Sequence, residues 1–306
     1  MRVLVLGARG QLGSEVKDQL YNRVPVHINS HLTVVEAARS DVDVSDFVAL
    51  RAFLKDQQPD WIINASAFTA VDAAEAESTL AYAINEGAVS CMAEYCRDHG
   101  SNLVHVSTDY VFSGEGDTPF SEEDAVSPLG VYGKSKLAGE QGIASTLSRH
   151  IMLRTSWVFG IHGKNFVKTM LSLASNRSEV RVVGDQVGAP TSAKGIARAI
   201  AEIIFVLNGA HDNDPRWGTY HFSGAPYVSW AAFAQQVFDA ALELGLIATT
   251  PKVTAITTEE YPTPARRPNN SRLDCAKIGR TFNVSADDWR DALRQMLLEM
   301  KGSSHL

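Results

Sequence analysis

The chain of 306 residues contains few cysteines, no long apolar run and no excess of positive charge. Its three cysteines, Cys91, Cys96 and Cys275, are odd in number and have no CxxC spacing, which argues against a disulfide framework and a zinc site. We therefore expect small buried thiols in a reducing cytoplasm. The apolar run at residues 3–6 is too short for a signal peptide, and no run reaches the roughly 20 residues of a membrane span.

The charge balance restricts the partners that the chain can bind. It holds 28 Lys and Arg against 35 Asp and Glu, a formal net charge of −7, so a nucleic-acid partner is not expected. A local basic pocket for a phosphorylated ligand remains compatible with this balance. Hydrophobic residues make up 45 % of the chain, which is enough to bury a sizeable core.

Short apolar runs alternate with longer amphipathic ones in the first half of the chain. The pattern predicts strands at 3–6, 32–36, 61–64, 103–107 and 152–155, and helices at 11–20, 47–55, 80–99 and 132–144. Asp46 is placed to cap the second helix. Near-continuous apolar strands between helices are typical of a parallel sheet that is covered on both faces. We predict an α/β fold with a Rossmann-type, doubly wound parallel sheet over residues 1–155.

This alternation ends near residue 156. The second half predicts a strand at 180–183, helices at 194–207, 230–244 and 286–300, and a proline-rich loop at 261–268. We interpret residues 156–306 as a smaller, discontinuous α/β lobe for the substrate, with part of 178–220 returning to the first domain.

A glycine-rich turn follows the first strand and opens the first helix. Gly7, Gly10 and Gly13 have GxxGxxG spacing rather than GxGxxG. Glycines allow the backbone to approach a pyrophosphate, whose charge is favourable at a helix N-terminus. The pattern therefore predicts a dinucleotide site.

Two charged residues near the second strand point to different dinucleotides. Glu36, 23 residues after Gly13, could bond the ribose 2′-hydroxyl of NAD. Arg39 could instead bind the 2′-phosphate of NADP. Asp43 and Val44 are candidates to flank the adenine, and the choice of cofactor stays open.

Tyr132 and Lys136 lie four residues apart, on one face of a predicted helix. A ketone that accepts a hydride needs a proton, and a phenol with a pKa near ~10 gives one poorly unless a cation stabilises the phenolate. Lys136 would supply that cation, and Thr108, at the carboxyl end of the fourth strand, would hold the carbonyl oxygen. The alternative is an ordinary exposed Tyr–Lys pair.

Seven segments together resemble one family. They are GARGQLG (7–13), NASAFTAVDAAE (64–75), STDYVF (107–112), YGKSKLAGE (132–140), RTSWVFG (154–160), DQVGAPT (185–191) and YPTPARRPNNSRL (261–273). They resemble the dTDP-4-dehydrorhamnose reductase family, which belongs to the extended short-chain dehydrogenases/reductases. The resemblance implies reduction of the 4-keto group of dTDP-4-dehydro-β-L-rhamnose by NADPH or NADH, in the cytoplasm.

The resemblance also implies a role for each matching residue. Thr108, Tyr132 and Lys136 would be catalytic, and Tyr132 and Lys136 would also hold the cofactor. The other cofactor residues would be Gly7, Gly10, Gln11, Leu12 and Gly13 at the pyrophosphate and Asn64, Ala65, Ser66 and Ala67 at the nicotinamide. The substrate residues would be Thr69, Val71, Asp109, Tyr110, Trp157, Arg266 and Arg267, with Asn165 and Phe166 as weaker candidates, while Asn85 is expected to be structural.

A metal and a dimer are further implications of the resemblance. Some members bind Mg²⁺ at a homodimer interface through acidic side chains, and Glu15 fits one such ligand. Lys194 stands where another acid is expected, so Mg²⁺ and this homodimer both stay open. Two other functions also stay open: a sugar-nucleotide epimerase or other ketoreductase of the superfamily, and a cofactor-binding regulatory subunit, although the intact Thr–Tyr–Lys set argues against the latter.

Overall fold

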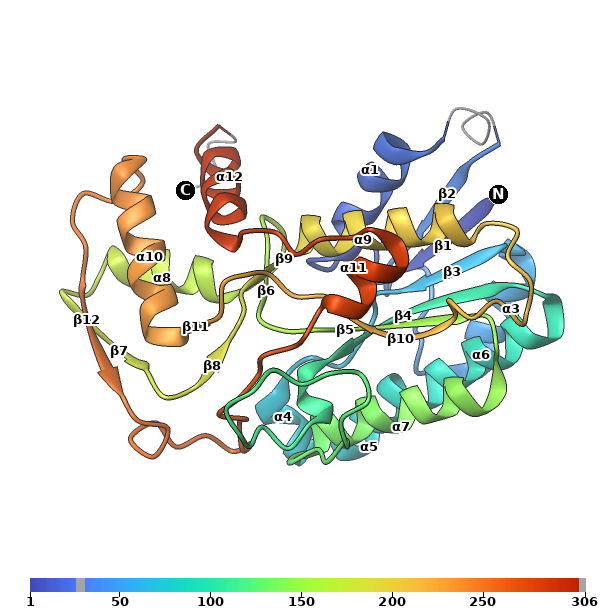
Figure 1. Cartoon of the computed structure of the whole chain (residues 1–306), viewed down its shortest axis with the longest axis horizontal. Coiled ribbons are helices and arrows are strands. Elements are labelled where there is room, and N and C mark those ends of the chain that lie inside the picture. The colour runs from blue at the N-terminus through green and yellow to red at the C-terminus, as the bar shows by residue number, and fades with distance from the viewer. Residues whose placement is uncertain (26–30, 303–306) are drawn as a thin grey trace.

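The computed structural model describes residues 1–25 and 31–302 and is built around a six-stranded sheet (Figure 1). Its strands are β1 (Arg2–Leu6), β2 (Thr33–Ala37), β3 (Trp61–Asn64), β4 (Asn102–Thr108), β5 (His150–Thr155) and β10 (Gly218–His221). They lie in the order β10-β5-β4-β3-β1-β2, and all neighbouring pairs are parallel. The predicted Rossmann-type parallel sheet is confirmed.

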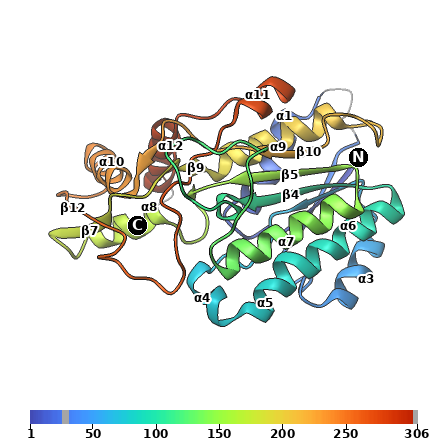
Figure 2. The same ribbon diagram turned by 60° about the horizontal axis from the view of Figure 1, so that its bottom comes forward.

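Helices cover both faces of this sheet (Figures 1 and 2). One face carries α1 (Gly13–Arg23), α9 (Ala193–Leu207) and α11 (Ala276–Phe282), and the other carries α3 (Phe47–Gln57), α6 (Ala88–His99) and α7 (Val131–Thr146). Along β1, Val3 and Val5 enter the first core while Leu4 and Leu6 enter the second. Successive side chains of a strand point to opposite faces, so a strand buried on both sides has an unbroken apolar sequence.

A smaller lobe extends from the carboxyl ends of the sheet, on the left of Figure 1. Its core is formed by α8 (Phe166–Ala174), α10 (Trp230–Glu243) and α12 (Trp289–Gly302). Its strand pairs are β7 (Glu179–Val183) with β12 (Lys252–Ile256), β8 (Val187–Gly188) with β11 (Val228–Ser229), and β6 (Val158–Phe159) with β9 (Thr191–Ser192). Between these segments, α9 packs on the large sheet and β10 extends it beside β5.

The helix predicted at 80–99 is divided in the structure. A π-helical turn, Ala83–Gly87, separates α5 (Ser78–Tyr82) from α6. Such turns place one extra residue in a helix and are frequent at functional sites. Here the turn contains Ile84, which lines a cleft at the edge of the sheet, and Asn85, whose amide oxygen accepts a hydrogen bond from Phe68 in the loop after β3.

Other local features follow the sequence more closely. Asp46 caps α3 as expected, because its carboxylate accepts hydrogen bonds from the backbone N–H groups of Val48 and Ala49.

The three cysteines carry free thiols. Among the helices that the structure describes, none has both the length and the apolar character to cross a bilayer.

Candidate active site

A cleft of about 800 Å³ opens at the carboxyl ends of the central strands. Parallel sheets bind ligands at this edge. The predicted residues that line the cleft are Gly7, Gly10, Gln11, Leu12, Arg39, Asp43, Val44, Ala65, Ser66, Ala67, Thr69, Val71, Thr108, Asp109, Tyr110, Tyr132, Lys136 and Trp157. Those outside its lining are Gly13, Glu36, Asn64, Asn165, Phe166, Arg266 and Arg267.

The glycine-rich turn after β1 has no room for a side chain at Gly7 or Gly13. Gly7 has a φ of +79°, and a Cβ on it would lie 2.8 Å from the carbonyl carbon of Ala65. A Cβ on Gly13 would lie 2.2 Å from the Gly7 oxygen, and the Gly10 N–H donates to that same oxygen at 2.9 Å. The turn therefore brings bare backbone to the cleft at the start of α1, which fits the pyrophosphate of a dinucleotide. Gly13 acts by allowing this packing rather than by lining the cleft.

Glu36 does not reach the cleft, contrary to expectation. Its carboxylate accepts a hydrogen bond from the ammonium of Lys17 on α1 at 2.7 Å. At the end of β2 the cleft is instead lined by Ala37, Ala38 and Arg39, and Arg39 forms an exposed ion pair with Asp43 at 3.2 Å. Arg9, which the sequence analysis did not single out, lies in the same lining.

The end of β4 brings three polar side chains to the cleft. The Thr108 hydroxyl donates to the Asp109 carboxylate at 3.0 Å and accepts from the Tyr110 N–H at 3.2 Å. Burial raises the pKa of Asp109 to about 6, against hydrogen bonds from Ser271 and Thr108 that lower it. The Tyr110 ring meets the Tyr132 ring edge to face, with centroids 5.4 Å apart.

Helix α7 is fixed against these residues at its first turn. The Val131 N–H donates to the Glu75 carboxylate at 2.9 Å, a favourable charge at a helix N-terminus. Gly133 permits close packing, because a Cβ there would lie 2.2 Å from the Tyr110 carbonyl oxygen. Tyr132 and Lys136 thereby line the same cleft as Thr108.

The pKa values of Tyr132 and Lys136 differ from the expectation that an adjacent ammonium makes the phenol more acidic. Burial raises the pKa of Tyr132 to about 12, although a hydrogen bond with Thr108 lowers it. Burial also lowers the pKa of Lys136 to about 8. The Lys136 amine is turned toward the sheet, where it lies 2.9 Å from Nε2 of His105 and donates to the Val106 carbonyl at 2.7 Å. The phenol is thus a weaker acid here than expected from an adjacent ammonium.

Two lining hydroxyls were missed by the sequence analysis. Ser107 and Thr155 sit near the ends of the paired strands β4 and β5, and both side chains line the cleft. Within residues 1–25 and 31–302, neither buried hydroxyl has a hydrogen-bond partner. Buried polar groups nearly always have a partner, so these hydroxyls are suited to a polar ligand. Their position at strand ends was the signal that could have identified them.

Trp157 is both packed and accessible to the cleft. Its ring stacks on Trp230 with centroids 3.5 Å apart and an interplanar angle of 13°. Its φ of +48° is uncommon for a bulky residue. Trp157 also lines the cleft, where a ligand could contact it. Its contact with substrate stays a prediction.

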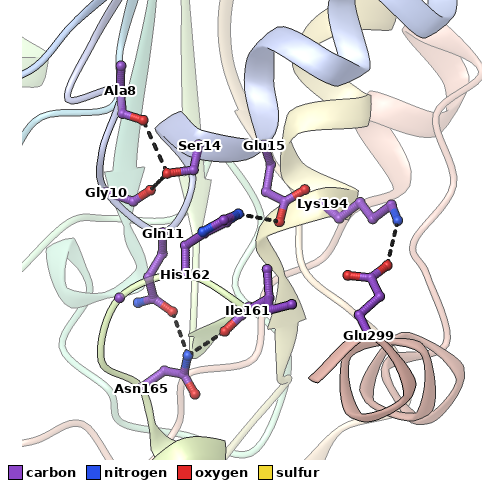
Figure 3. A network of polar contacts seen from close by, with 12 residues as sticks. Ala8, Gly10, Gln11, Ser14, Glu15, Ile161, His162, Asn165, Lys194 and Glu299 are labelled. Atoms are coloured by element: carbon purple, nitrogen blue, oxygen red, sulfur yellow. Dashed lines mark hydrogen bonds and ion pairs between the residues drawn. The ribbon is translucent and has the colours of Figure 1, made fainter. Parts of the chain in front are cut away.

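The remaining candidates connect segments around the cleft. Arg267 donates to the Asp72 carboxylate at 2.7 Å, and Arg266 is exposed, so their diphosphate role stays a prediction. Asn165 caps α8 and donates to Gln11 at 3.1 Å, which joins the small lobe to the glycine turn (Figure 3). Asn85 hydrogen-bonds the backbone of Phe68 on both sides, as suits the structural role expected of it.

Comparisons with known proteins place the chain in a family. The model of the RmlD substrate binding domain matches residues 1–301. A dTDP-4-dehydrorhamnose reductase of Aggregatibacter actinomycetemcomitans is 42% identical over 298 residues, which cover 96% of this chain and 98% of that protein. The chain belongs to the dTDP-4-dehydrorhamnose reductase family.

Solved structures of this family have the same fold over their full length. A dTDP-4-dehydrorhamnose reductase from Clostridium acetobutylicum superposes with a TM-score of 0.88 at 34% identity, covering 98% of this chain and 100% of the other. One from Bacillus anthracis in complex with NADP gives 0.85 at 31% identity, covering 97% and 99%.

The residues around Glu15 do not fit the Mg²⁺ site that the reductase family suggested. Figure 3 shows Glu15 of α1 near His162, at 3.9 Å, and the Lys194 ammonium bonded to Glu299 of α12 at 3.0 Å. Burial raises the pKa of Glu15, although the nearby charges of His162 and Lys194 lower it in part. An ammonium beside these carboxylates opposes a divalent cation. No group of three or more His, Cys, Asp or Glu side chains that could hold a metal occurs in the described part of the chain.

Proposed function

We propose that this chain reduces the 4-keto group of dTDP-4-dehydro-β-L-rhamnose to dTDP-L-rhamnose, with NADPH or NADH as reductant. One observation carries the proposal: Thr108, Tyr132 and Lys136 line a single cleft with the glycine turn. The family relatives named dTDP-4-dehydrorhamnose reductase, 42% and 40% identical over almost the whole chain, support this substrate.

The three side chains supply what a ketone reduction needs. A reduced nicotinamide, when bound, supplies a hydride, which forms the new C–H bond at C4 of the sugar. The electron pair of the C=O π bond then takes the phenolic proton of Tyr132, which leaves a phenolate. With a pKa raised to about 12, the phenol keeps its proton at neutral pH until this step. Lys136 in its ammonium form would stabilise the phenolate, and the Thr108 hydroxyl would turn away from Asp109 to donate its hydrogen bond to the carbonyl oxygen.

The cleft favours NADPH over NADH. Arg9 and Arg39 line its wall beyond β1 and β2, whereas Glu36 is held by Lys17 outside it. Guanidinium groups bind phosphate oxygens well, and a carboxylate beside the ribose would repel a 2′-phosphate. We therefore assign the 2′-phosphate of NADPH to Arg9 and Arg39.

The two parts of the chain divide the work in this proposal. Residues 1–155, with α9 and β10, hold the dinucleotide at the glycine turn, with Ala65, Ser66 and Ala67 on the nicotinamide side. The small lobe, together with Thr69, Val71, Asp109, Tyr110 and Trp157, holds the sugar nucleotide. Arg266 and Arg267 lie on a loop that is tied to α4 (Val71–Ala76) and could bind the diphosphate.

The test is a coupled measurement on one reaction mixture. The purified chain is mixed with NADPH and enzymatically prepared dTDP-4-dehydrorhamnose, and the absorbance of the reduced nicotinamide is followed while the sugar nucleotides are separated. The proposal predicts one dTDP-L-rhamnose for each NADPH consumed. Conversion of the sugar without loss of NADPH would indicate an epimerase. Cofactor binding with no conversion at all would indicate a binding subunit.

A further inference from the structure

A fully buried histidine joins the cofactor side of the cleft to the catalytic lysine. His105 lies on β4, paired in register with Asn64 of β3, and its side chain has no exposed surface. Its Nδ1 lies 3.0 Å from the Asn64 amide nitrogen, and its Nε2 lies 2.9 Å from the Lys136 amine. Each ring nitrogen therefore has one neighbour, and the donors and acceptors of these neighbours determine which ring nitrogen carries the proton.

The Asn64 amide has only one compatible orientation. Its oxygen accepts a hydrogen bond from the Ser66 backbone N–H at 3.1 Å and another from the Ser66 hydroxyl at 2.6 Å. A backbone N–H can only donate, so the amide oxygen must face Ser66 and the NH₂ group must face His105. The Nδ1 of His105 is then an acceptor, and the neutral ring carries its proton on Nε2.

This tautomer directs an N–H group at Lys136. An ammonium has three donors and no acceptor, so it cannot accept from Nε2–H. The neutral amine can accept it with its lone pair while donating to the Val106 carbonyl at 2.7 Å. The 2.9 Å contact is thus a hydrogen bond for the amine form and a meeting of two donors for the ammonium form.

We propose that His105 is a positioning residue for Lys136: Asn64 and Ser66 hold it in the Nε2–H tautomer, and this tautomer favours the amine over the ammonium. The inference deepens the proposed function, on which it rests, because Lys136 is there the cation beside Tyr132.

The surrounding charges agree with this assignment. Burial lowers the pKa of Lys136 to about 8, against the carboxylate of Glu140 on the same helix, which raises it. Arg154 of β5 is paired with Glu140 at 2.6 Å, and Tyr132 stays protonated in this range. Burial and the Lys136 charge hold the pKa of His105 well below its usual value, so the ring stays neutral. Lys136 is therefore an ammonium below about pH 8 and an amine above it.

The tautomer can be measured directly. In the full chain labelled with ¹⁵N-histidine, two-bond proton–nitrogen correlations report which ring nitrogen carries the proton, and loss of one signal in His105→Gln assigns it. We expect a neutral Nε2–H ring from about pH 5 to about pH 9. A ring protonated on Nδ1, or a charged ring, would overturn the inference. This readout needs no turnover, so it stands or falls separately from the reductase activity.

The effect on Lys136 is measured by NADPH binding as a function of pH. The affinity should fall as the pH rises through about 8, where the ammonium is lost. In His105→Gln the new amide oxygen can accept from the ammonium, so the midpoint should move up by about one pH unit. His150→Gln is the matched control, because His150 is buried on β5 and its ring lies at the Leu147 carbonyl rather than at Lys136.

The inference would be refuted if the pH midpoint of NADPH binding did not move in His105→Gln, or if it moved by the same amount in His150→Gln. If His105→Gln does not fold, Asn64→Asp replaces it. A carboxylate accepts from Nδ1–H, so this variant should reverse the tautomer in the same spectra and raise the binding midpoint. An unchanged Nε2–H signal in Asn64→Asp would equally refute it.

Discussion

The buried ion pair between Glu140 and Arg154 anchors the helix that carries the catalytic candidates. Glu140 lies on α7, as do Tyr132 and Lys136, and Arg154 lies on β5. The Arg154 guanidinium donates to the carboxylate at 3.0, 3.2 and 2.6 Å, and the two side chains are only 7% and 4% exposed. Removing one partner of such a pair costs about 3–5 kcal/mol, because the other charge stays buried. Glu140→Gln should therefore lose about that much stability.

The corresponding shift in melting temperature follows from the size of the chain. Unfolding entropy is about 2.1 cal/mol/K per residue, or about 0.6 kcal/mol/K for 306 residues. Glu140→Gln should then melt about 5–8 °C lower in differential scanning calorimetry. The control is Glu94→Gln, which breaks an exposed pair with Arg51 at 2.9 Å, with side chains 45% and 52% exposed. Exposed pairs contribute at most about 1 kcal/mol. Equal losses in the two variants would refute the reasoning.

Four further variants and a treatment with EDTA test the site. Tyr132→Phe should keep its NADPH affinity and lose a factor of about 10² or more in turnover, because the general acid is gone; retained turnover would exclude the proton-donor role. Lys136→Met should weaken NADPH binding in calorimetry and also slow turnover, and a loss of rate alone would exclude a role of Lys136 in holding the cofactor. Arg39→Ala should raise the Kd for NADPH about tenfold, as loss of a charge-assisted hydrogen bond does, and leave the Kd for NADH unchanged. EDTA should change neither the turnover nor the melting temperature of the unmodified chain, whereas Lys194→Glu should melt at a higher temperature when Mg²⁺ is added. Inhibition of the unmodified chain by EDTA would contradict the conclusion that Lys194 opposes a divalent cation near Glu15.

The sheet could be predicted because strands such as β1, β3 and β5 are buried on both faces. The strand expected at 61–64 is β3 without change, and the other four differ from the structure by two residues or fewer at each end. β10 was not predicted, since Gly218–His221 is short and lacks an apolar run. Its partner β5 comes much earlier in the chain, and no local pattern contains that pairing.

The site residues were predictable where a motif fixes the backbone, and less so where a side chain can point either way. The glycine turn and the Thr–Tyr–Lys set meet in one cleft as expected. Glu36 lies outside the cleft lining because side chains alternate along a strand: it is on the same face of β2 as Val34, which packs toward α1, and its carboxylate bonds Lys17. His105 could have been noticed as a polar residue within an apolar strand, but its partners Asn64 and Lys136 come from other elements.

Transfer of a labelled hydride tests the central claim most directly. NADPH deuterated at C4 of the nicotinamide, prepared separately on each face, is incubated with the chain and dTDP-4-dehydrorhamnose, and the product is examined by NMR and mass spectrometry. The account predicts dTDP-L-rhamnose with one deuterium at C4 of the sugar from one of the two preparations. A sugar product without deuterium from both preparations would contradict it.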